Sequence, residues 1–334
     1  MKDCKNYSLL HHNTFGIEAR CQRFLEYTDE QEAREVASLL TSSTLPYIII
    51  GGGSNLLLTR DFEGVVVHSA IRGVEQLDDC RVRCGSGEVW DDVVDWCVEH
   101  QLYGAENLSL IPGDVGASAV QNIGAYGAEV KDLIETVEAI EIATGALVTF
   151  SNADCQYGYR DSRFKHEWKN RYLVTHVVYQ LHTAFVPKLD YGNIRSALAA
   201  KGVDNVTAHE LRQVIIGIRR EKLPDPEVMG NAGSFFMNPV VSREQYEQLA
   251  AQYPQMPHYY IDEQHEKIPA GWMIDQCGWK GKSLGHAGVH DKQALVLVNR
   301  GGATGAEIVA LCQRIQQDVK RRFGIDIYPE VNVI

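Results

Sequence analysis

The chain has 334 residues, and its balance of 45% hydrophobic and 23% charged residues is typical of a folded, soluble protein. The length exceeds what one ordinary hydrophobic core accommodates and predicts two or three domains. The formal net charge of -12 argues against a nucleic-acid partner, although a local group of Arg and Lys residues could still bind an anionic ligand.

No apolar run approaches the roughly 20 residues that a membrane-spanning helix needs. The first residues, MKDCKNYSLLHHNTF, lack the apolar core of a secretory signal. The eight cysteines are scattered and form no Cys-x-x-Cys pair, which is typical of reduced, mostly buried thiols. We therefore expect a cytoplasmic protein that has no membrane partner and acts as a monomer.

Short apolar strands alternate with helical patterns along the chain. Strands are predicted at residues 47–50, 64–70 and 172–181. A helix is predicted at residues 88–100, where helical spacing gathers apolar side chains on one face, namely Trp90, Val93, Val94 and Cys97. The elements do not form a regular series of strand–helix–strand units, so the expected fold class is α+β or mixed α/β.

The second half of the chain contains two helix starts and one boundary signal. Ser242 with Gln245, and Thr304 with Glu307, have the spacing of a capping box. The segment KLPDPE at 222–227 places two prolines one residue apart and predicts a domain boundary. The last residues, IDIYPEVNVI, form a strand-like tail that we expect to pair with an earlier domain.

The first glycine-rich stretch is IIIGGGSNLLLT, residues 48–59. A strand that runs into glycines and then into Ser-Asn has the pattern of an anion-binding loop, because glycine lets backbone N–H groups approach a phosphate closely. The stretch fails the Rossmann fingerprint, since the third glycine would fall at Leu56. It is either a dinucleotide cradle of another fold or a tight β-turn.

The second stretch is IPGDVGASAVQNIGAYGAEV, residues 111–130, in which glycines are expected to interrupt regular structure. Small residues dominate and charges are few, a composition that an ordinary surface loop would not have. The backbone could lie along a flat or extended ligand, with Ser118 and Asn122 supplying hydrogen bonds. A packed loop without a ligand is the alternative.

Two familiar motifs are absent where the sequence suggests them. Residues 278–285, GWKGKSLG, contain Gly-Lys-Ser, but a phosphate-binding P-loop would need glycine at Gln276. A nucleophile elbow around Ser234 would need glycines at Ala232 and Phe236, so acyl transfer by this serine has no support.

A metal site is not expected either. His286 and His290 have the spacing of two zinc ligands on a helix, but Gly288 lies between them and the glutamate of the zinc-protease motif is missing. We interpret both histidines as surface or core residues.

Two further side chains have environments that suit chemistry on an anion. Arg160 lies in YGYRDSRFK, and an arginine fork beside tyrosines suits a carboxylate or a phosphate, although a structural Arg–Asp pair is equally compatible. Glu330 lies between Pro329 and Val331 on the expected terminal strand. A carboxyl partly withdrawn from water there would favour its protonated form, unless the strand is exposed.

Taken together, these stretches resemble one family, the UDP-N-acetylenolpyruvoylglucosamine reductases, flavoenzymes of peptidoglycan precursor synthesis. The matching motifs, in the family's order between residues 51 and 331, are GGGSN, IPGDVGASAVQNIGAYG, YGYRDS, KLPDP, GNAGSFFMNP, AGWMIDQCG and PEV. The segment around Tyr259 is similar to the tyrosine-bearing substrate loop of the longer of the family's two types.

The resemblance implies an α+β protein with a two-part FAD-binding region similar to the vanillyl-alcohol-oxidase-like flavoproteins, followed by a C-terminal α+β substrate domain. The implied domains are FAD-binding subdomain 1 at residues 1–66 plus 325–334, FAD-binding subdomain 2 at 67–222 and the substrate domain at 223–324.

The implied reaction is that of a UDP-N-acetylmuramate dehydrogenase, with bound FAD as cofactor and NADPH as co-substrate. NADPH reduces FAD, and a hydride then reaches the enolpyruvyl double bond of UDP-N-acetylglucosamine-enolpyruvate. The resulting enolate needs hydrogen-bonding or positive groups at its oxygens and an acid at its carbon. By motif match, Ser234 is the proton donor, and Arg160 and Glu330 stabilise the enolate.

The resemblance also implies binding residues. Those for FAD are Gly51, Gly52, Gly53, Ser54, Asn55, Leu56, Pro112, Gly113, Gly116, Ala117, Ser118, Asn122, Ile123, Gly124, Tyr126, Gly127 and Arg219. Those for the substrate are Tyr159, Tyr191, Lys222, Asn238, Tyr259 and Gln293.

The sequence departs from the family pattern at two positions. Met237 stands where lysine is common, and Asn332 stands where arginine can occur, so secondary binding contacts differ. Two other functions remain as alternatives: an FAD oxidoreductase of the same fold such as an alcohol oxidase, and a catalytically silent UDP-sugar-binding protein. A colourless purified protein would favour the silent binder, because bound flavin is yellow.

Overall fold

The computed structural model describes residues 1–203 and 205–334. The chain divides into two compact units. Unit 1 consists of Met1–Tyr7, Cys21–Gly52 and Phe62–Glu221. Unit 2 consists of Ser8–Arg20, Gly53–Asp61 and Lys222–Ile334. The three-domain division implied by the resemblance stays a prediction.

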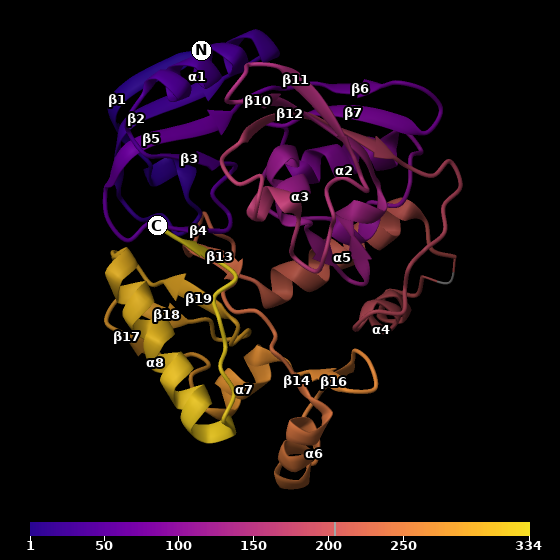
Figure 1. Ribbon diagram of the computed structural model, residues 1–334. Helices are drawn as coiled ribbons and strands as arrows, with labels where there is room; N and C mark the ends of the chain where they lie inside the picture. Colours follow the sequence, from indigo (N-terminus) through magenta and orange to yellow (C-terminus); the bar gives the residue numbers. More distant parts are fainter. Residues whose placement is uncertain (204) are drawn as a thin grey trace. The chain divides into compact units, whose positions relative to one another are not determined.

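One sheet of unit 1 has four strands in the order β1-β2-β5-β3 (Figure 1). Their bounds are Lys2–Ser8, Arg20–Tyr27, Phe62–Ser69 and Tyr47–Ile50. Both neighbours of β5 in the order, β2 and β3, run parallel to it. Helix α1, Glu30–Ser42, begins at Asp29, whose side chain accepts a hydrogen bond from Glu32 N. The strands predicted at 47–50 and 64–70 are confirmed.

The second sheet of unit 1 is antiparallel, with the order β11-β10-β12-β7-β6 (Figure 1). Its strands span Leu147–Ser151, Ile134–Glu141, Tyr172–Gln180, Arg81–Gly85 and Val74–Gln76. Helix α2, Trp90–Glu99, shares a hydrophobic core with this sheet. All of the apolar face predicted for α2 is buried, as is most of the strand predicted at 172–181.

The segment 111–130 is more regular than predicted, because it contains helix α3, Val115–Gln121, and a short hairpin of β8, Gly124–Ala125, and β9, Ala128–Glu129. Glycine in a helix costs about 1 kcal/mol relative to alanine. Here the cost is offset by close packing, since a Cβ on Gly116 would lie 2.9 Å from Ser86 Cβ. The small residues therefore serve helix packing as well as ligand approach.

Unit 1 also contains α4, Ile194–Ala200, and α5, Ala208–Lys222, except for the last residue of α5, which belongs to unit 2. The two helices share a small apolar cluster. Arg212 of α5 is almost fully buried, and its guanidinium lies 2.7 Å from Asp91 Oδ1 and 2.7 Å from Asp95 Oδ1 of α2. A buried charge of this kind requires such partners, so the ion pairs fix α5 against α2.

Unit 2 has a four-stranded sheet in the order β13-β19-β18-β17 and a three-stranded sheet in the order β14-β16-β15 (Figure 1). The first consists of Asn231–Ser234, Val296–Asn299, Ala287–Val289 and Ser283–Leu284, and the second of Val240–Ser242, His265–Lys267 and Tyr259–Tyr260. The helices are α6, Arg243–Gln252, α7, Ala270–Gln276, and α8, Gly305–Phe323.

Both predicted helix starts in unit 2 are confirmed. At Thr304 the two bonds of a capping box with Glu307 are present, and α8 follows. At Ser242 the side chain accepts a hydrogen bond from Gln245 N, and α6 follows. The long α8 buries one stripe of its surface in the core of unit 2, which accounts for its amphipathic sequence.

The C-terminal tail forms less strand than its sequence predicts. Only β20, Asn332–Val333, is a strand, and it pairs in parallel with β4, Leu56–Leu57, which comes early in the chain but belongs to unit 2. Residues before it are held individually: Met237 N donates to Tyr328 O, and Glu330 N donates to Phe235 O. The tail is therefore an extended segment with hydrogen bonds to two different partners.

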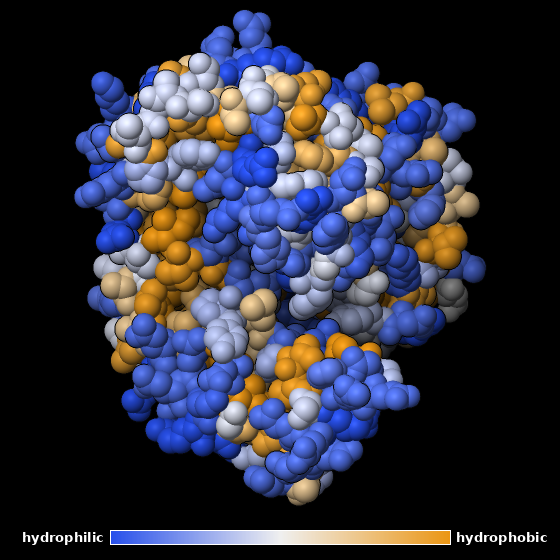
Figure 2. Space-filling model, viewed as in Figure 1, coloured by the Kyte–Doolittle hydropathy of each residue, from blue (hydrophilic) through white to orange (hydrophobic). Residues whose placement is uncertain are grey.

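Figure 2 shows that hydrophilic residues cover most of the visible surface, with hydrophobic residues in smaller areas. Within residues 1–203 and 205–334, no helix has the length and apolar character needed to cross a bilayer.

Gly53→Ala should destabilise the protein strongly. Gly53 has a φ of +67°, and a Cβ there would overlap the carbonyl oxygen of His12. Gly302 has a φ of +74° but no atom within 4 Å of its hypothetical Cβ, so Gly302→Ala is a matched control. In chemical denaturation we expect losses of more than about 2 kcal/mol for Gly53→Ala and about 1 kcal/mol for Gly302→Ala. Equal losses would contradict the packing described here.

Candidate functional site

In unit 1, the first two glycines of GGGSN lie against the second glycine-rich stretch. A Cβ on Gly51 would lie 2.7 Å from Ala117 Cβ, and a Cβ on Gly52 would lie 3.1 Å from Asp114 Oδ1. These distances leave no room for a larger side chain, so the backbones of the two stretches pack directly on each other. The two segments predicted to hold FAD are thus brought together.

The donor set in this part of unit 1 fits a dinucleotide. Gly113 has a φ of +120° and Gly127 one of +79°, conformations that glycine adopts without strain. Gly124 is also constrained, because a Cβ on it would lie 3.1 Å from Arg160 Nη1. A backbone kept bare of side chains suits close approach of phosphates and flat rings.

Arg219 of α5 contributes a partly buried cation to the same unit. Its Nε donates to Leu110 O at 3.2 Å, just before the second glycine-rich stretch. Burial lowers the pKa of the guanidinium, an effect that nearby Tyr126 and Asp91 oppose. Arginine nevertheless stays charged at neutral pH, so Arg219 supplies positive charge in a protected position.

The guanidinium of Arg160 lies at the C-terminal end of α3. Its Nη2 donates to Gly124 O at 2.6 Å and its Nη1 to Asn122 O at 3.4 Å. Asp161 instead contacts His166 at 2.7 Å. The guanidinium is therefore oriented by backbone carbonyls at a helix end, which attract positive charge.

Ser234 is the last residue of β13 in unit 2 and is exposed. Gly233 before it has a φ of +66° and donates its N–H to Asn231 Oδ1 at 2.9 Å. Phe235 and Phe236 after it are buried, and Phe235 N donates to Leu295 O. The strand and the phenylalanines fix the backbone on both sides of the exposed Ser234.

The backbone of Glu330 is hydrogen-bonded to the residue that follows Ser234, in the same unit. Glu330 N donates to Phe235 O at 2.8 Å, and Pro329 forms an isolated bridge with Phe236. Glu330 is not in a strand, contrary to the sequence prediction, because regular pairing resumes only at Asn332. Its side chain is partly exposed. Two predicted catalytic residues that are distant in sequence are thus neighbours in unit 2.

The remainder of GGGSN belongs to unit 2 and has a structural task that the sequence did not reveal. Asn55 O accepts hydrogen bonds from both the backbone N and the side chain of Asn332, each at 3.1 Å. Asn55 Nδ2 donates to Glu330 O at 3.4 Å. Asn55 therefore holds the C-terminal tail, whereas its contact with FAD, like those of Gly53, Ser54 and Leu56, stays a prediction.

The predicted substrate residues occur in both units. In unit 1, Tyr159 and Tyr191 are exposed; Arg160 lies 5.7 Å from the Tyr159 ring centroid, and Tyr191 packs edge-on against Tyr126. In unit 2, Asn238 Oδ1 accepts from Ala270 N at 2.9 Å, which places the amide at the start of α7.

The other predicted substrate residues of unit 2 differ in how tightly they are held. Tyr259 is exposed in β15, and Lys267 Nζ lies 5.8 Å from its ring centroid. Gln293 Oε1 accepts from Leu295 N at 3.4 Å, and Lys222 is exposed at the end of α5. Lys267 was not predicted as a neighbour of Tyr259; it pairs with Tyr259 across strands β15 and β16.

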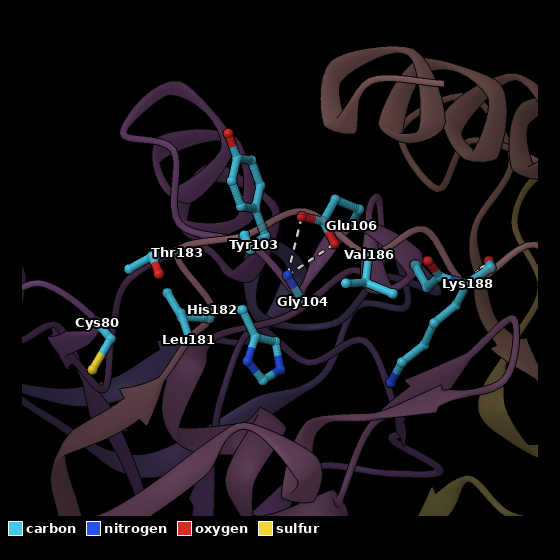
Figure 3. Close-up of a pocket in the computed structure, with 11 residues that line it drawn as sticks. Cys80, Tyr103, Gly104, Glu106, Leu181, His182, Thr183, Val186 and Lys188 are labelled. Atoms are coloured by element: carbon cyan, nitrogen blue, oxygen red, sulfur yellow. Dashed lines mark hydrogen bonds between the residues drawn. The ribbon is translucent and has the colours of Figure 1, made fainter. Parts of the chain in front are cut away.

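A hollow of about 490 Å³ in unit 1 contains none of the predicted site residues (Figure 3). Tyr103, Glu106, His182 and Lys188 are among its lining residues. Both carboxylate oxygens of Glu106 accept from Gly104 N, at 3.0 and 2.9 Å, and burial raises the pKa of this carboxyl (Figure 3). The Glu106 carboxyl therefore stabilises its own loop through its hydrogen bonds with Gly104 N.

Glu30, Glu138 and His176 form an acidic group whose ligand atoms lie within 4.8 Å of one another. The guanidinium of Arg83 already occupies the space among them: its Nη2 lies 2.6 Å from Glu138 Oε2, 3.1 Å from Glu30 Oε1 and 2.9 Å from His176 Nδ1. The cation that balances this group is therefore an arginine of the chain itself.

His68 links the first sheet to the start of α3, and sequence analysis missed it. Its Nδ1 lies 2.9 Å from Glu26 Oε2, and its Nε2 lies 3.4 Å from Asp114 Oδ2, beside Gly52. Burial alone would lower the pKa of His68, but the hydrogen bonds with Asp114 and Glu26 together raise it above the ordinary value. The protonated imidazole thus stabilises the folded state between two carboxylates.

The His68 contribution should depend on pH. A raised pKa in the folded state stabilises fully below the unfolded pKa of about 6.5, and the contribution is lost as the pH rises through the folded value. His68→Gln should therefore lower the free energy of unfolding more at about pH 6 than at about pH 9. The exposed His209→Gln is the control. A difference between His68→Gln and wild type that does not change with pH would contradict the assignment.

Two family models match separate parts of this chain. Residues 21–151 match the model of an FAD binding domain, and residues 225–334 match that of the UDP-N-acetylenolpyruvoylglucosamine reductase C-terminal domain. The UDP-N-acetylenolpyruvoylglucosamine reductase of Bacteroides fragilis strain YCH46 is 58% identical over 99% of both chains. That of Pseudomonas aeruginosa is 48% identical, over 98% of this chain and 97% of the relative.

A solved structure shows the same fold at lower identity. The UDP-N-acetylenolpyruvylglucosamine reductase of Thermus caldophilus aligns with a TM-score of 0.69 and 21% identity, over 99% of this chain and 98% of that one. The predicted resemblance, the α+β fold class with an FAD-binding region and the FAD cofactor are confirmed. On the identity with the curated relatives, this chain belongs to the UDP-N-acetylenolpyruvoylglucosamine reductase family and is an FAD-binding oxidoreductase.

Proposed function

We propose that this chain reduces the enolpyruvyl ether of UDP-N-acetylglucosamine-enolpyruvate to UDP-N-acetylmuramate, a step of peptidoglycan precursor synthesis, with NADPH as the electron source. A cytoplasmic location and a monomeric state are part of the proposal. The observation that carries it is the hydrogen bond from Glu330 N to Phe235 O, which keeps Glu330 beside Ser234 in unit 2. An acid and a carboxyl next to each other suit a substrate that becomes an enolate.

When bound, FAD supplies the transfer of a hydride from NADPH to the terminal carbon of the enolpyruvyl group. Negative charge then develops on the neighbouring carbon and spreads into the carboxylate. The protein's part in this reaction is to stabilise that charge and to deliver one proton to the carbon.

Ser234 is the proposed proton donor. A serine hydroxyl is a weak acid, but an enolate is a strong acceptor, so a positioned hydroxyl can complete the reduction. The exposed residue follows Gly233, which has no side chain to hinder the substrate. Because Ser234 is exposed, the serine oxygen can regain its proton from water after each turnover.

Arg160 and Glu330 are proposed to stabilise the enolate oxygens. The planar guanidinium of Arg160 presents several N–H donors in a fixed fork, a geometry that suits a carboxylate. Two of its nitrogens already donate to Asn122 O and Gly124 O, which fixes the plane of the group. Glu330 donates a hydrogen bond to the enolate when its carboxyl is protonated.

The remaining substrate contacts are proposed by motif match: Tyr159, Tyr191, Lys222, Asn238, Tyr259 and Gln293. Lys222 suits an anionic group, such as a diphosphate or the phosphates of the nicotinamide nucleotide. Tyr259 is exposed, and Lys267 lies near its ring. An exposed tyrosine of the substrate loop can contact a ligand as the ligand enters. Met237 is exposed where lysine is common in the family and would add no charge here.

Ser234→Ala should separate the two halves of the reaction. NADPH should bleach the flavin of the variant at a rate within about twofold of wild type, whereas turnover with UDP-N-acetylglucosamine-enolpyruvate should fall by at least about 100-fold, because the enolate lacks its acid. Stopped-flow absorbance measures the rate of flavin reduction, and steady-state NADPH oxidation measures turnover.

Ser283→Ala is the matched control, since it removes a hydroxyl from another strand of the same unit, where Ser283 Oγ accepts from Arg300 Nε. This control should keep wild-type turnover. Near-normal turnover of Ser234→Ala would refute the proton-donor role, and slow flavin reduction in that variant would assign Ser234 to another step.

A further inference from the structure

Asn122 was predicted as an FAD contact, but its side chain makes three hydrogen bonds within the protein. The residue is fully buried and caps the C-terminal end of α3 with a left-handed φ of +48°. Its Nδ2 donates to Gly158 O at 2.6 Å and to Glu129 Oε2 at 3.0 Å, and its Oδ1 accepts from Lys131 N at 3.1 Å. These bonds account for both amide hydrogens and one acceptor position.

The contacts of Asn122 converge on the segment that carries Arg160. We call residues 158–161 the arginine turn; Gly158 and Asp161 exchange backbone hydrogen bonds across it, at 3.0 and 3.2 Å. Asn122 makes two hydrogen bonds to this turn. Its side-chain amide donates to Gly158 O, and its backbone carbonyl accepts from Arg160 Nη1. One residue thus fixes both the backbone at the start of the turn and the guanidinium at the end of the side chain.

The arginine turn needs such support because its backbone is unfavourable. Arg160 has a φ of +55°, a conformation that costs a residue with a Cβ about 1–2 kcal/mol. Lys165 Nζ donates to Arg160 O at 2.7 Å, and Ser162 Oγ donates to Val120 O at 2.6 Å, so the turn is also tied down on its C-terminal side. Strained positions of this kind persist where the surroundings over-determine them.

We propose that Asn122 is a positioning residue that sets the orientation of Arg160 toward the enolate, and not a ligand of FAD through its side chain. The inference rests on the role of Arg160 in the proposed function. It predicts that loss of the Asn122 amide donors slows the step in which Arg160 acts and leaves the reduction of the flavin largely unchanged.

Asn122→Asp is the sharpest variant. It keeps the size and the acceptor for Lys131 N, but a carboxylate cannot donate to Gly158 O and is repelled by Glu129. In the FAD-loaded enzyme we expect reoxidation of the reduced flavin by UDP-N-acetylglucosamine-enolpyruvate to slow by at least about tenfold, because a displaced catalytic group loses its alignment. The flavin-to-protein absorbance ratio and flavin reduction by NADPH should stay within about twofold.

A double-mutant cycle distinguishes positioning from general damage. Arg160→Ala adds no backbone strain, since arginine already carries a Cβ at this φ. If Asn122 acts through Arg160, Asn122→Asp should change reoxidation less than about twofold in the Arg160→Ala background, whereas independent effects multiply. Asn152→Asp is the matched control: Asn152 Nδ2 also donates to two carbonyls, those of Lys131 and Ile134, and its loss should leave both half-reactions as in wild type.

The outcomes distinguish the proposed role of Arg160 from the positioning role of Asn122. A wild-type rate for Arg160→Ala would refute the proposed role of Arg160 and the inference with it. A slow Arg160→Ala together with a normal Asn122→Asp, or with multiplicative losses, would overturn the inference alone. If Asn122→Asp does not retain FAD, Asn122→Gly, which tolerates the same φ, replaces it. Loss of FAD in both would assign Asn122 to the cofactor site and overturn the inference.

Discussion

The arrangement of unit 2 depends on the hydrogen bonds that hold the C-terminal tail. Glu330 N donates to Phe235 O, Met237 N donates to Tyr328 O, and Asn55 bonds both Glu330 and Asn332. Backbone groups bonded on both sides resist displacement, since a buried N–H or C=O left without a partner costs free energy. The tail therefore carries Glu330 to Ser234 and stays there, even though only two of its residues form a strand.

Unit 1 depends on a different constraint: the two glycine-rich stretches can pack on each other only where glycine leaves no side chain between their backbones. Gly51 and Gly52 let the first glycine-rich stretch lie on Ala117 and Asp114. At the other end of α3, the carbonyls of Val120, Asn122 and Gly124 accept hydrogen bonds from Ser162 and Arg160. One short helix thus joins the segments predicted to bind FAD, at its start, to the arginine turn at its end.

Local patterns predicted much of the fold, whereas the residues of the candidate site followed from the family resemblance and their roles stay a prediction. The apolar spacing of α2 and the Thr304–Glu307 capping box are local signals, and both are confirmed. Helix α3 was missed because glycine and alanine have no periodic apolar pattern, and its close packing is visible only in three dimensions. Asn55, Asn122 and His68 act on residues far away in sequence, so neither residue type nor spacing could indicate their partners.

The central claim is that one chain takes electrons from NADPH and passes them to an enolpyruvyl UDP-sugar. An anaerobic titration of the wild-type FAD-loaded enzyme tests it most directly. The flavin is first bleached with one equivalent of NADPH, and UDP-N-acetylglucosamine-enolpyruvate is then added. We expect the oxidised flavin spectrum to return in proportion to the substrate added and UDP-N-acetylmuramate to form in equal amount. A flavin that stays bleached after the substrate is added would contradict it.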